Sequence, residues 1–211
     1  MSAKPAVRSR TTAQERRAQI VDVATHLFSQ HGFGGVTMAM LAGECGVTEP
    51  ALYRYFNSKE ELYEAVLTSL KDRLNIGEAL AGLAALDDIE ELLFGVARYI
   101  IGTYGSNTEL SRLLLLSALE GHPLAKRAFD DLRMPFVKFL TQKFESLKRR
   151  NRIRDVHPQI TARCFIGMVM DCALSLHLWR DFQGPRYDPK DVIQNNVQIY
   201  VAGLRPTGQD D

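Results

Sequence analysis

Residues 37–59, TMAMLAGECGVTEPALYRYFNSK, decide the fold of this chain. The first half of this stretch repeats small and apolar side chains at helical spacing, so one face of a helix can be buried: Met38, Leu41, Ala42 and Cys45. Thr37 is placed to cap that helix, and Gly46 follows it, where a left-handed residue allows a sharp turn. Thr48 then opens a second helix of about two turns, with Glu49 and Pro50 in its first turn.

The second helix carries polar, aromatic and basic side chains on its outer face. Leu52 and Phe56 are one turn apart and are expected to point inward, which turns Arg54 outward. A short outward helix after a tight turn is typical of the helix that reads DNA in a helix-turn-helix unit. Ser58, with Glu61 three residues later, predicts a capping box that starts the following helix.

The candidate DNA contacts fall into two groups. Arg54 is the main candidate for reading a base, because its planar guanidinium matches the two acceptors of guanine. Phosphate contacts are expected from Thr37, Thr48, Tyr53, Tyr55 and Lys59. Pro50 and Ala51 are placed to touch a thymine methyl group, whereas Glu49 can accept from cytosine, repel wrong contacts or only favour the helix dipole. Partial burial against the first helix of the motif is the alternative for Tyr53.

The first 62 residues resemble the N-terminal domain of the tetracycline-repressor (TetR/AcrR) type of bacterial transcription regulators. The matching positions are Arg17, Ile20, Ala24, Leu27, Phe28, His31, Gly32, Phe33, Thr37, Leu41, Ala42, Cys45, Gly46, Val47, Thr48, Leu52, Tyr53, Tyr55, Phe56, Ser58, Lys59, Glu60, Glu61 and Leu62. The departures are mild: Cys45 stands where the family usually has alanine, Leu41 where it often has isoleucine, and Ala39 offers no polar group to DNA.

The whole chain is expected to be all-α, with about nine helices and no convincing strand. Residues 1–58 form the expected DNA-binding domain with a basic arm, and residues 59–211 a helical regulatory and dimerisation domain. Further helices are predicted from about residue 88 to 104, 109 to 120, 123 to 150, 157 to 181 and 188 to 203. A Gly/Ala-rich break is expected between residues 76 and 86, and Pro135 is a candidate interruption.

Composition places the chain among ordinary cytoplasmic proteins. Its 211 residues carry a net charge of +1, and its three cysteines are widely spaced, which indicates reduced thiols. No signal peptide is expected, because residues 1–17 are polar and basic, and no apolar stretch is expected to reach the roughly eighteen residues of a membrane span. We expect no catalytic residue, no metal site and no cofactor, since no nucleophile with a base and no ligand spacing is recognisable.

Two basic segments stand out against the small net charge. Residues 1–17 hold five basic residues against one acidic residue: Lys4, Arg8, Arg10, Arg16 and Arg17 against Glu15. This arm is either drawn into a minor groove beside the motif or is a solvated tail. The second segment, residues 143–154, is expected to end a long helix, where cations suit the dipole, rather than to form a second nucleic-acid contact.

The last two helices, about residues 160–181 and 189–203, carry many small side chains at helical spacing. They include Ile160, Cys164, Gly167, Met168, Asp171, Cys172, Ser175, Leu178, Val192, Asn196, Ile199 and Gly203. Small residues let helices approach closely. The family resemblance implies a homodimer through these helices. Two heads roughly 34 to 36 Å apart would read a pseudo-palindromic operator in double-stranded DNA.

The resemblance also implies a pocket for a small apolar or amphipathic ligand in the middle of the chain. Candidate lining residues are Phe94, Tyr104, Leu116, Glu120, Phe129, Phe136, Phe165 and Met168. Plain core is the preferred alternative for each apolar member, and a structural pair is the preferred alternative for Glu120 with His122. A ligand there would shift the helix that begins after Ser58 and so change the spacing of the heads.

The expected function is therefore that of a homodimeric DNA-binding repressor, associated with the bacterial nucleoid and released from its operator by a small ligand. Control by a protein partner is the alternative, as is control by oxidation of cysteines such as Cys164 and Cys172. These two lie two helical turns apart and would have to pair across a dimer.

Overall fold

The computed structural model describes residues 12–179 and 187–206, and the residues so described form ten α-helices and no strand. The helices are α1 (Ala13–His31), α2 (Met38–Glu44), α3 (Glu49–Leu52), α4 (Lys59–Asp72), α5 (Ile76–Ala84), α6 (Ile89–Ser106), α7 (Thr108–Leu119), α8 (Pro123–Arg149), α9 (Pro158–His177) and α10 (Pro189–Leu204). The all-α class predicted from the sequence is confirmed.

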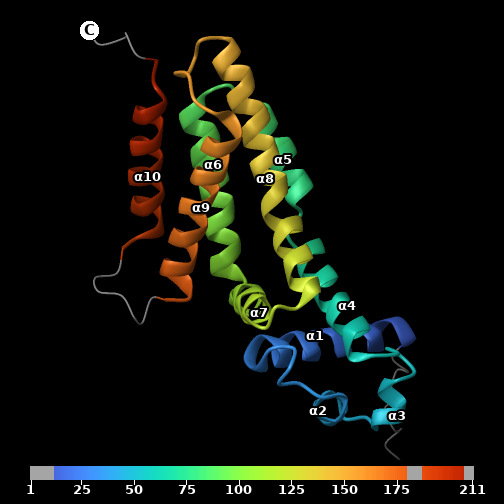
Figure 1. Cartoon of the computed structure of the whole chain (residues 1–211). Helices are drawn as coiled ribbons and strands as arrows, with labels where there is room; N and C mark the ends of the chain where they lie inside the picture. Colours follow the sequence, from blue (N-terminus) through green and yellow to red (C-terminus); the bar gives the residue numbers. More distant parts are fainter. Residues whose placement is uncertain (1–11, 180–186, 207–211) are drawn as a thin grey trace, which may run out of the picture.

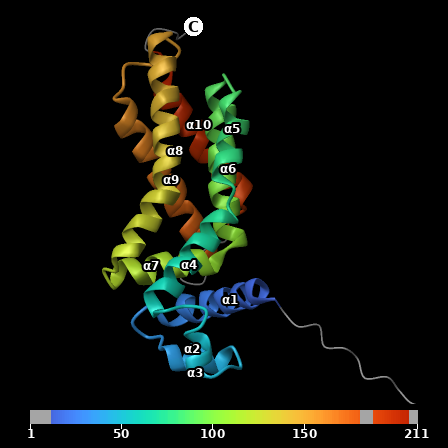
Figure 2. The same cartoon turned by 90° about the vertical axis from the view of Figure 1, so that its right-hand side faces the viewer.

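A small head and an elongated body make up the molecule (Figure 1). The head contains α1, α2 and α3, and α4 runs from it into the body. In the body α6, α8, α9 and α10 lie side by side, while α7 lies across their lower end and rests on α1 (Figures 1 and 2). Two hydrophobic clusters follow this division. The body cluster joins α6, α8, α9 and α10, whereas the head cluster joins α1 to α4 with Leu110, Leu113 and Leu114 of α7.

Side-chain caps set several helix starts. At α1 the capping box is complete, because Glu15 N–H donates to Thr12 Oγ1 at 3.1 Å and Thr12 N–H donates to Glu15 Oε2 at 2.7 Å. At α4 only the first half of the expected box forms, with Glu61 N–H donating to Ser58 Oγ at 3.1 Å. The Glu61 carboxylate instead accepts the backbone N–H of Asn57 at 2.8 Å. Hydrogen bonds from Asn57 hold the pKa of Glu61 below its usual value.

The expected break between residues 76 and 86 is wrong, since most of this segment is helix α5. The left-handed residue Asn75, with φ 47°, separates α5 from α4. Ile76, Leu80 and Leu83 recur at helical spacing and pack against the body cluster. This burial outweighs the cost of roughly 1 kcal/mol for each glycine inside a helix. The described residues therefore hold one helix more than the nine expected.

Two further expectations about the body need correction. Helix α8 continues through Pro135 without interruption. Helix α9 is long and apolar enough to cross a membrane by length and composition alone, with a mean hydropathy of 1.3 in its most apolar window. The sequence expectation that no stretch reaches this length is therefore wrong. Only 28% of that window is buried inside the chain.

Candidate functional site

Helices α2 and α3 form the predicted helix-turn-helix, at the end of the molecule opposite the α8–α9 connection (Figure 1). Thr37 caps α2 by accepting the N–H of Met40 at 3.2 Å. Gly46 makes the turn with φ 64°, a conformation that side-chain-bearing residues rarely adopt. Leu52 and Phe56 are fully buried, as their spacing predicts.

The second helix is tighter than a regular α-helix. Only Glu49–Leu52 is α-helical, and the chain then continues with Arg54 N–H donating to Ala51 O at 3.3 Å and Tyr55 N–H to Leu52 O at 2.9 Å. These bonds span three residues, so the second turn is 3₁₀-like and Arg54 lies on it. Thr48 begins the helix but its side chain makes no capping hydrogen bond.

Most candidate DNA contacts are exposed around α3 and at the start of α2. The exposed ones are Thr37, Thr48, Glu49, Pro50, Tyr53 and Arg54, whereas Ala51, Tyr55 and Lys59 are half-buried. Tyr53 keeps 43% of its surface exposed, so it is partly covered and part of the side chain stays accessible. Within residues 12–179 and 187–206, the Arg54 side chain has no hydrogen bond or ion pair. Its guanidinium is therefore available to a partner outside the chain.

Lys59 is held differently from the other candidates. Its ammonium donates to the backbone oxygens of Phe33 at 2.8 Å and Val36 at 2.9 Å, and it lies 4.1 Å from the centre of the Phe33 ring. An ammonium has three N–H donors, so one is left for a phosphate. Lys59 thus ties the α1–α2 loop to the start of α4.

Two arginines of the basic segment brace the motif on α1. Arg16 donates to the backbone oxygen of Cys45 at 2.7 Å. Arg17 lies 4.0 Å from the centre of the Phe56 ring and donates to Glu61 at 3.2 Å. These contacts fix α2 and α3 relative to α1. Lys4, Arg8 and Arg10, the other basic residues of the proposed arm, lie outside the described residues.

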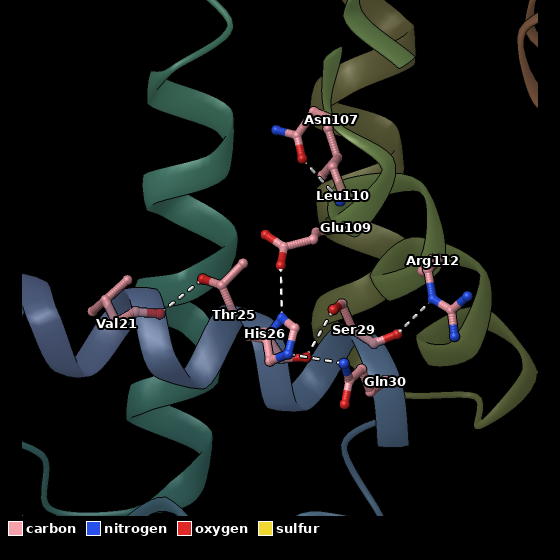
Figure 3. Close-up of polar contacts among 9 residues, drawn as sticks. All are labelled: Val21, Thr25, His26, Ser29, Gln30, Asn107, Glu109, Leu110 and Arg112. Carbon is pink, nitrogen blue, oxygen red and sulfur yellow. Dashed lines mark hydrogen bonds and ion pairs between the residues drawn. The ribbon is translucent and has the colours of Figure 1, made fainter. Parts of the chain in front are cut away.

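The head meets the body through α1 and α7 (Figure 3). His26 Nδ1 lies 3.1 Å from a carboxylate oxygen of Glu109, and Arg112 Nε donates to the backbone oxygen of Ser29 at 3.2 Å (Figure 3). His26 also contacts Gln30 Nε2 at 2.8 Å. These polar contacts surround the α7 leucines that join the head cluster, so α1 and α7 form one continuous contact.

Glu120, at the end of α7, carries a second head–body contact. Its carboxylate accepts the backbone N–H of Phe33 at 2.9 Å and that of Gly34 at 3.1 Å. A Cβ atom at Gly32, where φ is 71°, would lie 2.3 Å from Glu120 Oε1. The carboxylate therefore sits in a concave loop of backbone donors that only a glycine at position 32 leaves open. We name this contact the Glu120 latch.

An aromatic stack supports the latch. The His122 ring lies 4.2 Å from the Phe33 ring and 5.1 Å from the Tyr63 ring, measured between centroids. His122 Nδ1 also accepts the N–H of Leu124 at 3.2 Å and so caps α8. Tyr63 is fully buried, bonds to Ser117, and has a pKa raised by burial. Glu120 and His122 thus each make structural contacts, but among the described residues no hydrogen bond joins them to each other as the expected pair.

A small apolar cavity of about 30 Å³ lies among the α4–α5 link, α5, α6, α7, α8 and α9. Its lining consists of Leu74, Ile76, Tyr99, Ile100, Thr103, Tyr104, Leu110, Leu132, Arg133, Phe136, Ile166 and Met170. Tyr104 and Phe136 are the two pocket candidates that it brings together. Sequence reasoning missed Arg133, whose Nε is buried without a hydrogen-bond partner among the described residues.

The remaining pocket candidates lie elsewhere. Phe94 lines a groove between α6 and α10, and Phe165 is buried against Tyr200 with 5.0 Å between ring centroids. Phe129 is 39% exposed, while Leu116 and Met168 are half-buried away from the cavity lining. Glu120 belongs to the latch. Helical spacing alone identifies apolar residues but not which of them face a common space.

The second basic segment, residues 143–154, includes the end of the long helix α8, as the sequence predicted. Lys143 donates to the backbone oxygens of Ala84 at 2.6 Å and Leu86 at 2.9 Å, where it satisfies the end of α5. Lys148 pairs with Asp155, and Arg154 donates to Gly203 O at 3.3 Å. These cations serve the body's own helices.

The cysteines offer little sign of a reactive thiolate. Burial raises the pKa of the Cys45 and Cys172 thiols. Cys172 also accepts a hydrogen bond from Asn196 at 3.1 Å, which ties α9 to α10, whereas Cys164 is exposed. Among the residues that the structure describes, no group of three or more His, Cys, Asp or Glu is placed to hold a metal ion.

A family profile and individual relatives both match this chain. The sequence profile of the family described as "Bacterial regulatory proteins, tetR family" matches residues 20–66. The nucleoid occlusion factor SlmA of Mannheimia succiniciproducens is 37% identical over 139 residues, which cover 60% of this chain and 61% of that protein. SlmA of Pasteurella multocida is 34% identical over 149 residues, or 65% of this chain and 70% of that protein. The chain thus spans about three fifths of the length of the first of these relatives.

Among solved structures, the crystal structure of AibR in complex with isovaleryl coenzyme A and operator DNA superposes with a TM-score of 0.65. The two chains are 22% identical, and the alignment covers 88% of this chain and 97% of AibR. This likeness shows a shared fold.

Proposed function

The chain belongs to the tetR family of bacterial regulatory proteins, and from this membership we propose that it is a cytoplasmic, homodimeric repressor whose operator binding is released by a small ligand. Proteins of this family are DNA-binding transcriptional regulators. Dimerisation, repression and ligand release are the proposed part.

The main support for DNA binding is the exposed side chain of Arg54, which is unpaired among the described residues. It lies on the outward turn of a helix-turn-helix and has no partner within the described chain, although Arg16, Arg17 and Lys59 in the same head are all engaged. A cation left unpaired on an exposed reading element is suited to a bidentate contact with guanine. The phosphate contacts proposed for Thr37, Thr48, Tyr53 and Tyr55 would set the position of the head.

The exposed face of α9 and α10 supports the proposed homodimer. Ile160 and Ile199 are 58% and 65% exposed, and Cys164 and Gly203 are also exposed on this face. An apolar helix such as α9, with only 28% of its window buried, needs further cover. A second copy placing the same two helices against it would supply that cover with twofold symmetry.

The position of the cavity supports release by a ligand. Leu74 and Ile76, which line it, flank the junction between α4 and α5. Five side chains of α4 are buried in the head cluster, so a displacement of α4 carries the head with it: Leu62, Tyr63, Val66, Leu67 and Leu70. A ligand larger than about 30 Å³ would have to displace part of the lining, and this junction belongs to that lining. Ligand binding would thereby favour a head spacing that no longer fits the operator.

The test measures operator affinity of the full chain with and without candidate ligands, beside its oligomeric state by sedimentation. We expect a dimer that binds one pseudo-palindromic site and weakens at least tenfold when a cavity ligand is present. A monomer at the concentrations that bind DNA would contradict the dimer. Operator affinity unchanged by every ligand that binds the cavity would contradict release.

A second candidate is a DNA-bound regulator that answers to a protein. The two SlmA relatives, at 34% and 37% identity, are nucleoid occlusion factors, and this cavity is small. In that case substitutions in the cavity leave function intact, whereas substitutions on the body surface abolish it. Cysteine oxidation is disfavoured by the raised pKa of Cys45 and Cys172, and it predicts a loss of DNA binding in peroxide.

A further inference from the structure

Helix α7 contacts the head near both of its ends. Near its start, Glu109 lies against His26 and Arg112 donates to the backbone of Ser29, which joins α7 to α1 (Figure 3). At its end, Glu120 accepts from the loop that follows α1. The contacts follow the same order along both segments, so α1 and its loop run beside α7 in the same direction. The Glu120 latch therefore closes the far end of this interface.

The latch and α4 hold the same residue of the loop from two sides. The N–H of Phe33 donates to Glu120 at 2.9 Å, and the backbone oxygen of Phe33 accepts from Lys59 at 2.8 Å. Val36 is fully buried in the head cluster, and Thr37 next to it caps α2. The loop is thus tied to α2, and through α2 to the reading element.

The loop leaves room for the carboxylate of Glu120. A Cβ atom at Gly32 would lie 2.3 Å from Glu120 Oε1, and one at Gly34 would lie 3.4 Å from the same oxygen. The carboxylate is the far end of a flexible side chain, so a methyl group at position 32 would push it out of the loop. A change on the head can therefore open the latch as well as a change on the body.

Helix α3 lies farther from the body than the latch does. In both views α1 rests on α7, and α2 and α3 lie on the side of α1 that faces away from the body (Figures 1 and 2). A tilt of α1 on α7 would therefore move α3 sideways. In the proposed dimer this movement changes the separation of the two α3 helices. One base pair of spacing amounts to roughly 3.4 Å along DNA and about 34° around it, so a small tilt matters.

We propose that Glu120 is a positioning residue for operator binding, because its latch fixes the angle between head and body and so the half-site spacing that the dimer accepts. Glu120 acts through the loop and α2 and makes no contact with DNA itself. The inference rests on the proposed homodimeric DNA-binding function. In that function Arg54 selects a base, whereas Glu120 selects the distance between half-sites. The rival role of the latch is to stabilise the fold alone.

The test uses the full chain and operators that differ only in the number of base pairs between the half-sites. We expect the unaltered chain to bind one spacing best. In Glu120→Ala, the preference for this spacing over those one base pair shorter or longer should fall roughly threefold or more, because each head loses two hydrogen bonds. The preference for the correct bases within a half-site should not change. Glu120→Gln, which keeps one acceptor oxygen, should give an intermediate value.

Gly32→Ala opens the latch from the other side and should lower the spacing preference as Glu120→Ala does. Combining the two substitutions should lower it no further, because the latch is already open. The strain of alanine at φ 71° is present with and without Glu120, so it cancels in this comparison. Glu145→Ala, at an exposed carboxylate of α8, is the control and should keep the preference.

Urea unfolding of each variant, measured beside DNA binding, ensures that only folded protein is compared. An unchanged spacing preference in both Glu120→Ala and Gly32→Ala would overturn the inference, as would additive losses in the double variant. A base preference that falls as far as the spacing preference would show that the latch only maintains the fold. In each of these cases a dimeric unaltered chain with one preferred spacing leaves the proposed function standing. An unaltered chain that binds every spacing equally would overturn both.

Discussion

We propose that sequence discrimination depends mainly on Arg54. The tightened turn after Leu52 places it outside the regular part of α3, and neighbouring cations of the head are already engaged in internal contacts. Charge alone would not distinguish Arg54 from Lys59. The difference lies in whether the head itself uses the cation.

Replacing Arg54 with alanine is expected to relax sequence preference. Loss of a bidentate guanine contact costs about 1–3 kcal/mol of discrimination for each head. The measurement is the ratio of operator affinity to non-specific affinity, which should fall while non-specific binding changes little. Arg149→Ala, which removes an exposed cation of α8, should leave the ratio unchanged. A ratio equally unchanged in Arg54→Ala would remove the assigned role.

Lys59→Ala should act on every DNA sequence alike. If its third N–H binds a phosphate, the slope of log affinity against log salt becomes shallower by about 0.9 for each phosphate that the variant no longer neutralises. The variant also lacks two bonds to the α1–α2 loop, so the head should unfold more easily. Salt titration and urea unfolding separate the two effects, with Lys138→Ala as the control. An unaltered slope would leave Lys59 with its structural role alone.

At the scale of elements, the Glu120 latch joins the end of α7 to the α1–α2 loop. Two backbone donors, of Phe33 and Gly34, converge on one carboxylate, and the His122 ring stacks beside them. The latch thus joins the part of the head that Lys59 also holds to the corner between α7 and α8. The corner between α7 and α8 is thereby in direct contact with the loop that precedes α2.

Glu120→Ala is expected to loosen the head from the body. The loss of two hydrogen bonds at an exposed site should lower the free energy of unfolding by roughly 1 kcal/mol. It should also speed hydrogen exchange at the Phe33 and Gly34 amides. Glu145→Ala, at an exposed carboxylate of α8, is the control. Exchange at these two amides as slow as in the unaltered protein would show that the latch does not hold the loop.

The sequence predicts those helix boundaries that are marked by residues close to them in the chain. Thr37 and Gly46 mark boundaries that the structure confirms, because a cap or a left-handed turn acts within a few residues. Helix α5 was missed because its glycines favour a break, while its stability comes from packing against the body. The partners of Glu120 could not be predicted, because Phe33 and Gly34 lie far away in the sequence. The hydrogen bond from Phe33 N–H to the Glu120 carboxylate joins residues 87 positions apart, so it leaves no local pattern in the sequence.

At the scale of the whole molecule, the proposed homodimer would cover the exposed apolar face of α9 and α10. Ile199 is among its most exposed apolar side chains. Ile199→Asp is expected to convert the dimer to a monomer, because a carboxylate buried without a partner strongly disfavours association. Sedimentation equilibrium measures this directly, and operator affinity should fall with it.

Gln198→Asp is the matched control for the dimer. Gln198 is exposed one turn after Gln194, which lines the groove toward α6 on the other flank of α10. It should leave the dimer intact. An Ile199→Asp variant that remains dimeric would place the partner surface elsewhere.

In the proposed dimer, two heads read a symmetric site, each through its own Arg54. Selection of bound sequences from randomised DNA by the full chain tests it most directly. We predict an inverted repeat whose half-site centres lie about one DNA turn, or roughly 10 base pairs, apart. The conserved guanine of each half-site should disappear when Arg54→Ala is selected in parallel. Enrichment of a single unrepeated half-site, or of no sequence at all, would contradict the account.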